Sequence, residues 1–287
     1  MASQSPAQHP QLPLPNYFSQ FANVYAKQTG HTTLTILADV ITDNVQVSCN
    51  AFSQGSIVHD TAAGPAIGAA ALIARLCKHE LPLEVLVTDN EPKMVTAAEE
   101  SLDASPLHGH VKCRILDSEN LTAVADEYFT HSMNNFSIFA FLHPVEAIRE
   151  TCRTLKTGGL AIVTCWRRFA PMVIVHAAQK KIRPDLPLME TPSPEFYEDG
   201  VLQKVVEQGG FAKENINVVT KELLVTDPEN KKGLYTLMSG PFMAKARLGY
   251  TKAEEDRWAG AIEQAMAEEE GDFGGIKFEA YVLLATK

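Results

Sequence analysis

Short apolar runs alternate with stretches of helical spacing over the first two thirds of the chain. Five runs follow one another, at residues 56–60, 83–89, 110–117, 127–135 and 159–166. Each of the first four runs is followed by a segment with apolar residues three and four apart. The first of these segments begins at about residue 66, and the other three cover 91–102, 119–126 and 143–155. Because parallel strands are joined by crossovers that are usually helical, this order predicts a parallel sheet with helices on both faces.

Two further apolar runs, residues 214–225 and 276–287, predict additional strands and bring the total to about seven. The predicted fold class is therefore α/β, with a Rossmann-like, doubly wound, seven-stranded and mostly parallel sheet.

The outer parts of the chain are less regular. Residues 1–15 are rich in Pro and Gln and predict a disordered tail, and residues 16–287 predict a single domain. Aromatic side chains recur at helical spacing over 16–30, so a helical segment begins the fold. We expect residues 16–50 and about 167–275, the latter inserted after strand five, to contribute a substrate cap.

Charge and cysteine usage narrow the class of protein. The net charge is −10 and no Lys/Arg-rich run occurs, so we expect a small-molecule partner and no nucleic acid. The five cysteines lack metal-ligand spacing, which predicts no metal site and reduced thiols. No stretch reaches the about 20 apolar residues of a membrane-spanning helix, so we expect a cytoplasmic protein without membrane contact.

The loop after the first run, from Asp60 to Gly68, holds mostly small residues. It lacks the Lys-Ser/Thr pair of a P-loop, and the dinucleotide pattern is met only by Gly64, Ala66 and Ala69. A carboxylate at Asp60 would repel a pyrophosphate but suits a cation such as the ammonium group of S-adenosylmethionine. Helix capping by Asp60 is an equal alternative.

Acids also end the second and third runs. Asp89 lies about 25 residues after the glycine loop, where one carboxylate can accept hydrogen bonds from both ribose hydroxyls. Asp117 and Ser118 place an acceptor and a hydroxyl where an adenine amino group would lie. Three acids at successive strand ends predict a nucleoside with a cationic substituent more strongly than any one acid does.

These motifs give the chain a resemblance to a known family. Residues 17–166 resemble a class I S-adenosylmethionine-dependent methyltransferase of the ubiquinone-biosynthesis-like branch, which includes fungal secondary-metabolite enzymes such as the gliotoxin S-methyltransferase. "VHDTAAG", "VTDNEPKMV" and "CRILDSENL" are similar to its first three motifs. The usual Gly-x-Gly is Gly64-Pro65-Ala66 here, and His143-Pro144 stands where the family often has an acid before a helix.

The resemblance implies S-adenosylmethionine as cofactor and a set of site residues. The cofactor-binding residues are Tyr25, Asp60, Ala62, Gly64, Asp89, Asn90, Met94, Asp117, Ser118 and Asn134. The substrate-binding residues are Tyr17, Phe21, Phe136 and Trp166. The catalytic candidates are Asn134, Asn135 and His143.

Several of these residues have plainer alternatives. The two amides can orient a polar acceptor or mark a turn after a strand, and Trp166 can wall a pocket or pack in the core. A base would help a thiol or phenol acceptor, and His131, His143 and His176 are candidates, although packing or surface positions are commoner for such histidines.

We therefore expect methyl transfer to O, N or S of a small, largely apolar or aromatic metabolite in secondary metabolism. A cyclisation or other non-methylating step on the same fold, and a non-catalytic regulatory binder, are the alternatives. The acceptor and the oligomeric state are left open.

Overall fold

The computed structural model of the protein describes residues 30–191 and 193–287. The predicted tail, the aromatic segment at 16–29 and the side chains of Tyr17, Phe21 and Tyr25 lie outside the described residues.

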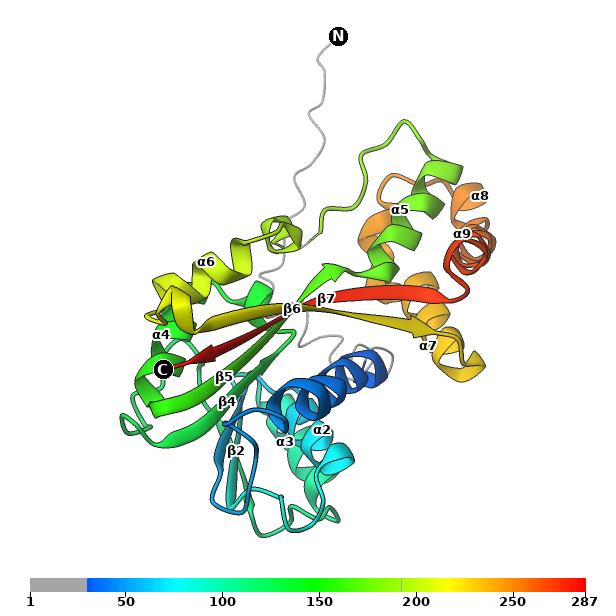
Figure 1. The fold of residues 1–287 in the computed structure, drawn as a ribbon. Coiled ribbons are helices and arrows are strands. Elements are labelled where there is room, and N and C mark those ends of the chain that lie inside the picture. The colour runs from blue at the N-terminus through cyan, green and yellow to red at the C-terminus, as the bar shows by residue number, and fades with distance from the viewer. Residues whose placement is uncertain (1–29, 192) are drawn as a thin grey trace.

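The described residues form a seven-stranded sheet in the order β3-β2-β1-β4-β5-β7-β6, which confirms the predicted Rossmann-like fold class (Figure 1). Strands β1 to β5 run parallel, and β7 runs antiparallel to both β5 and β6. The strands are β1 Ile57–Thr61, β2 Glu84–Asp89, β3 Val111–Ile115, β4 Phe129–Asn135, β5 Leu155–Arg168, β6 Ile216–Val225 and β7 Ile276–Thr286. The strand order reverses between β1 and β4, and ligands bind at such a switch point.

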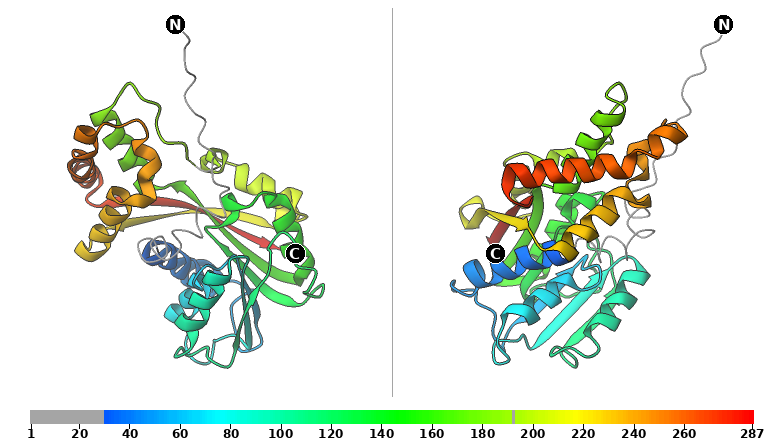
Figure 2. Two further views of the ribbon diagram at one scale, coloured as in Figure 1. Left: turned by 180° about the vertical axis from the view of Figure 1, so that it is seen from behind. Right: turned by 90° about the vertical axis from the view of Figure 1, so that its right-hand side faces the viewer.

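Helices cover both faces of the sheet, as Figure 2 shows. The α-helices are α2 Ile67–Arg75, α3 Pro92–Leu102, α4 Pro144–Thr154, α5 Ala170–Ile182, α6 Val201–Gln208, α7 Pro228–Ser239, α8 Lys252–Glu255 and α9 Trp258–Phe273. Short helical segments are η1 Ile41–Val45, η2 Ile138–Ala140, η3 Pro194–Tyr197, η4 Lys213–Asn215 and η5 Pro241–Arg247. Residues 30–40 are also helical and lead into η1.

Two hydrophobic clusters, one on each face, hold these layers together. The larger cluster joins the sheet to the helical segment at 30–45 and to α2, α3, α5, α7 and α9. The smaller cluster joins the opposite face to α4 and α6, and Phe196 is buried there. Within the region 167–275, α5, α7, η5, α8 and α9 gather beside one end of the sheet, with α5, α7, η5 and α9 packed on one another, and we call these five elements the helical group.

The helix predicted over 119–126 is wrong, because the connection from β3 to β4 consists of turns. Leu121 and Val124 are buried at the spacing of a helix, but they pack as separate turn residues. Asp117 accepts the N–H of Glu119 and forms a bridge with Asn120, an alternative to helical hydrogen bonding.

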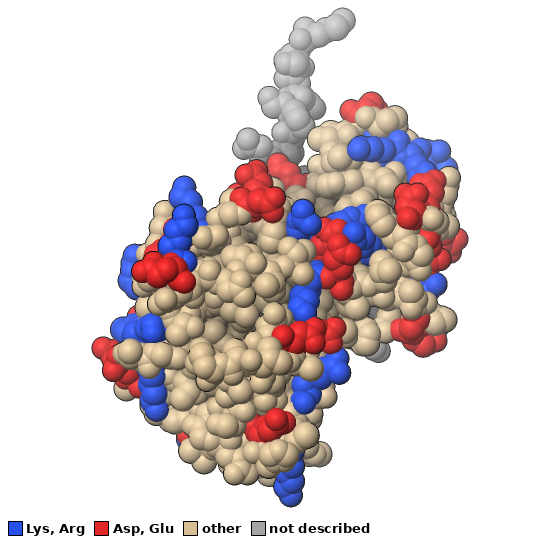
Figure 3. Space-filling view, in the orientation of Figure 1, with Lys and Arg blue, Asp and Glu red and all other residues tan. Residues whose placement is uncertain are grey.

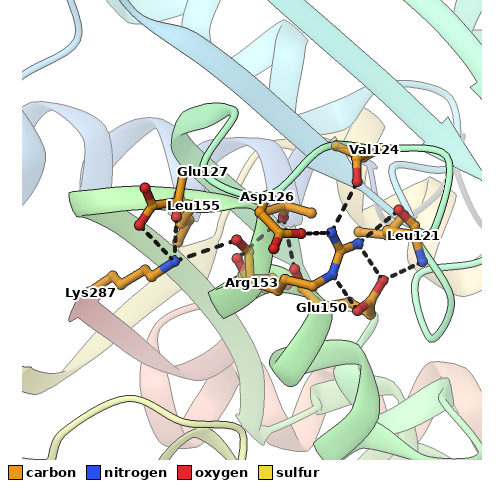
Figure 4. Close-up of polar contacts among 10 residues, drawn as sticks. Leu121, Val124, Asp126, Glu127, Glu150, Arg153, Leu155 and Lys287 are labelled. Atoms are coloured by element: carbon orange, nitrogen blue, oxygen red, sulfur yellow. Dashed lines mark hydrogen bonds and ion pairs between the residues drawn. The ribbon is translucent and has the colours of Figure 1, made fainter.

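Arg153 on α4 holds this connection in place (Figure 4). Its guanidinium donates to the carbonyl oxygens of Leu121 at 2.9 Å and Val124 at 3.0 Å, and it pairs with Asp126 and Glu150. The Glu150 carboxylate also accepts the Leu121 N–H. Side chains of α4 thus supply part of the hydrogen bonding that a helix would make within itself.

Replacement of Arg153 by Met should lower the free energy of unfolding by about 2–3 kcal/mol, because it leaves half-buried carbonyl and carboxylate groups unpaired. Arg149→Met on the same helix is the matched control, since Arg149 is exposed and pairs only with Glu146. It should change stability by no more than about 0.5 kcal/mol. Urea unfolding compares the two variants, and equal effects would show that Arg153 does not anchor the connection.

Candidate functional site

A cleft of about 230 Å³ opens at the carboxyl ends of the central strands. The loops after β1, β2, β3 and β4 form its walls, and the helical segment at 30–40 closes one side. Its lining residues are Gly30, Thr33, Ala62, Ala63, Gly64, Pro65, Ile67, Asp89, Asn90, Glu91, Met94, Asp117, Ser118, Glu119, Asn135, Phe136, Ser137, Phe139, Ala140, Phe141 and Leu142. The structure thus gathers seven of the predicted cofactor residues: Ala62, Gly64, Asp89, Asn90, Met94, Asp117 and Ser118.

The loop between β1 and α2 has a strained backbone. Ala62, Gly64 and Ala66 have φ values of 47°, 56° and 66°. The left-handed conformation costs about 1–2 kcal/mol at each alanine, whereas glycine adopts it freely. A side chain on Gly64 would meet no atom within 4 Å, so this position faces open space in front of the loop. Ala66, which stands where the family has its second glycine, adopts this left-handed conformation and is fully buried.

Asp60 lies beneath this loop and does not line the cleft. Its Oδ2 accepts the Ala69 N–H at 2.9 Å, near the start of α2, and its Oδ1 has no partner. A Cβ on Gly68 would lie within 2.3 Å of the carboxylate, so glycine provides the space for it. Burial, with a smaller contribution from Asp89, raises the pKa of Asp60 to about 7. The contact is the one expected of a helix cap.

Asp89 ends β2 and lines the cleft. One carboxylate oxygen accepts the Gly64 N–H and the other accepts the Glu91 N–H, both at 2.9 Å. Burial raises the pKa of Asp89 above its ordinary value, and these two backbone donors oppose that rise. Each oxygen retains a further lone pair for a ligand hydroxyl.

Glu119, which the sequence analysis did not select, connects two walls of the cleft. Its Oε1 accepts the N–H groups of Leu142 at 2.8 Å and His143 at 3.1 Å, and its Oε2 contacts His143 Nδ1 at 2.8 Å. The loop after β3 is thereby tied to the loop after β4. His143 itself does not line the cleft, and its side chain is 70% exposed.

The side chains of Asn134 and Asn135 at the end of β4 point to opposite faces of the sheet, because successive residues of a strand alternate. Asn135 lines the cleft, whereas Asn134 is buried and does not. Phe136, with a φ of 54°, follows as part of the wall. Trp166 is 2% exposed and lies behind Phe136, with ring centroids 4.0 Å apart.

The other candidate histidines lie away from the lining. His131 is buried, contacts Thr130 Oγ1 and the Asn50 carbonyl, and has its pKa lowered by burial. His176 contacts the Met189 carbonyl. Packing roles account for both contacts.

Most residues that line the cleft lie in a segment that matches a known domain. Residues 61–163 match the protein family described as a methyltransferase domain. Methyltransferase ucsB of an Acremonium species is 29% identical over 115 residues, which are 37% of this chain and 40% of that protein. The match therefore spans about two fifths of the curated relative.

Solved structures share the fold over most of the chain. The YcgJ protein of Bacillus subtilis has a TM-score of 0.51 and 17% identity, with 90% of this chain and 98% of that chain covered. The phosphoethanolamine N-methyltransferase 2 of Haemonchus contortus, solved with S-adenosylhomocysteine, has a TM-score of 0.54 and 13% identity. There, 97% of this chain and 61% of that chain are covered. At these identities the likeness concerns the fold.

The burial of the Asp60 carboxyl can be tested by measuring how the stability of the protein depends on pH. Its folded pKa of about 7 lies above its ordinary value of 3.8, so between about pH 4 and 7 the unfolded chain loses a proton that the folded protein retains. The contribution of Asp60 to the free energy of unfolding of the wild-type protein therefore falls as pH rises. Asp60→Asn does not titrate, so its stability relative to wild type should rise over this window by up to about 4 kcal/mol. Urea unfolding at several pH values measures the difference, and a flat difference would refute the buried-carboxyl assignment.

Among the described residues, no group of three metal-ligating side chains is gathered and no helix has the length and apolarity to cross a membrane. The described lining of the cleft contains Asp89, Glu91, Asp117 and Glu119 but no Lys or Arg, which disfavours a phosphate and suits a cationic cofactor. The open face at Gly64 and the remaining lone pairs of Asp89 fit an adenosyl group. Residues 61–163 thus match a methyltransferase domain, and the described part of the chain has the fold of a solved methyltransferase.

Proposed function

We propose that this protein transfers the methyl group of S-adenosylmethionine to O, N or S of a small, largely apolar or aromatic molecule. The observation that carries the proposal is the shared cleft, in which the ends of β2 and β3 bring carboxylates to the glycine loop and no Lys or Arg stands among the described lining residues. Acidic and basic side chains are intermixed on the face in Figure 3, which supports a small acceptor over an anionic polymer.

The cofactor would be held by residues from three successive loops. Asp89 accepts the two ribose hydroxyls, and Asp117 with Ser118 receives the adenine amino group. Asn90 and Met94 flank the nucleoside, and the loop from Ala62 to Gly64 supports the methionine portion. Asp60 acts from below, through Ala69, by keeping the loop in this conformation.

The cofactor supplies an electrophilic methyl group on a positively charged sulfur. The residues of the chain then need to align the acceptor and exclude water, as proximity catalysis requires. Phe136, backed by Trp166, gives a rigid floor, and Asn135 provides a polar contact beside it. A general base from His143 is not part of this proposal, since that side chain is largely exposed.

The acceptor side of the cleft is apolar. Phe136, Phe139, Phe141 and Leu142 line it, which suits an aromatic or aliphatic molecule. We propose that the segment at 16–50 and the helical group form the substrate cap. The motif resemblance to fungal secondary-metabolite enzymes supports an acceptor from secondary metabolism.

Asp89→Asn should weaken the binding of S-adenosylhomocysteine at least tenfold, because an amide keeps the shape but loses one acceptor oxygen and the negative charge. Glu84→Gln, at the opposite end of the same strand, is the matched control and should bind as wild type does. Isothermal calorimetry gives both dissociation constants. Equal affinities for Asp89→Asn and wild type would remove Asp89 from the ribose site.

Methyl transfer itself is tested with methyl-labelled S-adenosylmethionine, the full chain and an extract of small aromatic and apolar metabolites. We expect label to appear in a small, organic-soluble product and to be lost when Asp89 is replaced by Asn. Binding of the cofactor without any transfer of label would contradict methyl transfer and favour a non-methylating step on this fold.

A further inference from the structure

Unpaired polar atoms gather where β4 and β5 end. Four buried side-chain atoms there have no hydrogen-bond partner among residues 30–191 and 193–287: Asn134 Oδ1, Asn135 Nδ2, Ser137 Oγ and Trp166 Nε1. Native proteins pair nearly all buried polar groups, so such a concentration indicates a group that binds there. Asn135 and Ser137 line the cleft, so their two unpaired atoms are the ones of the four that belong to its wall.

Thr164, fully buried on β5 and paired in register with Asn135, determines which atom Asn135 offers. The Thr164 hydroxyl oxygen accepts the Phe136 N–H at 2.9 Å, and its single hydrogen is donated to Asn135 Oδ1, also at 2.9 Å. The opposite amide orientation would leave the hydroxyl hydrogen and Oδ1 both unpaired. The free atom of Asn135 is therefore the donor Nδ2.

The unpaired donor Asn135 Nδ2 favours a ligand group that accepts a hydrogen bond. Nδ2 cannot take a proton, and Ser137 Oγ can donate beside it. Among the described lining residues, the carboxylates come from the loops after β2 and β3. The one that reaches the loop after β4, Glu119, accepts the N–H groups of Leu142 and His143 there. His131, His143 and His176 do not line the cleft. A hydroxyl that remains protonated would gain less here than an ionised or carbonyl oxygen.

We propose that Asn135 Nδ2, oriented by Thr164, donates a hydrogen bond to an unprotonated oxygen of the methyl acceptor. The proposal rests on the proposed function and narrows its substrate class to molecules that present an ionised aryl or enol oxygen, or a carbonyl oxygen, beside Phe136. Asn135 is the contact residue in this account, and Thr164 is a positioning residue.

The probe is 4-nitrophenol, whose absorption spectrum reports its ionisation. It is titrated over pH in the presence of full-length protein saturated with S-adenosylhomocysteine. Charge-assisted donation to the phenolate should lower the pKa of the bound probe by about one unit relative to the free probe. Failure of the probe to bind, or binding with an unchanged or raised pKa, would overturn the proposal.

Variants separate positioning from general stability. Thr164→Val should remove the pKa shift of the probe, Thr164→Ser should restore it, and Asn135→Asp should raise the probe's pKa because a carboxylate replaces the donor. Thr151→Val, which removes a buried hydroxyl on α4, is the control and should keep the shift. If Thr164→Val does not fold, Asn135→Asp decides the outcome.

Affinity for S-adenosylhomocysteine is measured in the same variants and should stay within about twofold of wild type. Loss of that affinity in Asn135→Asp would show that the donor serves the cofactor's own carboxylate, which would overturn the proposal. The spectral shift requires no methyl transfer. A shift without transfer of label to any acceptor would therefore contradict the proposed function and leave the donor site standing.

Discussion

Two buried carboxylates hold the loop on which the cleft is built. Asp89 accepts the Gly64 N–H from the side, and Asp60 accepts the Ala69 N–H from below. The loop between them contains left-handed alanines and would otherwise leave backbone donors unpaired. Because both acids come from strand ends, the rigidity of the sheet passes directly to the loop. The wall formed by the loop after β1 therefore depends on two hydrogen bonds from backbone N–H groups to these carboxylates.

The opposite wall depends on acids and a guanidinium outside the sheet. Glu119 ties the loop after β3 to the loop after β4, and Arg153 holds the remainder of the same connection against α4. These contacts replace a crossover helix. The edge of the cleft at Glu119 and Leu142 is therefore formed by turns, and hydrogen bonds to side chains fix their conformation.

The sheet was predictable because buried parallel strands appear as apolar runs that end at polar residues. The error at 119–126 arose because Leu121 and Val124 are buried at helical spacing in a segment whose hydrogen bonds go to Arg153 and Glu150. Seven of the cofactor candidates line one cleft, since the carboxyl ends of parallel strands meet at the same edge.

Other site residues depend on contacts that spacing does not reveal. Asn134 and Asn135 are neighbours in sequence but face different sides of β4, and Trp166 lies behind Phe136 rather than in the wall. Glu119 acts through backbone groups more than twenty residues away, and Thr164 through an amide on the adjacent strand. No local pattern marks either residue.

The central claim is that the cleft beside Gly64 binds the adenosyl cofactor. A crystal structure of the full chain with S-adenosylhomocysteine tests this claim most directly. The account predicts the ribose on Asp89 and the adenine beside Ser118; a ligand bound elsewhere, or no binding at millimolar concentration, would contradict it.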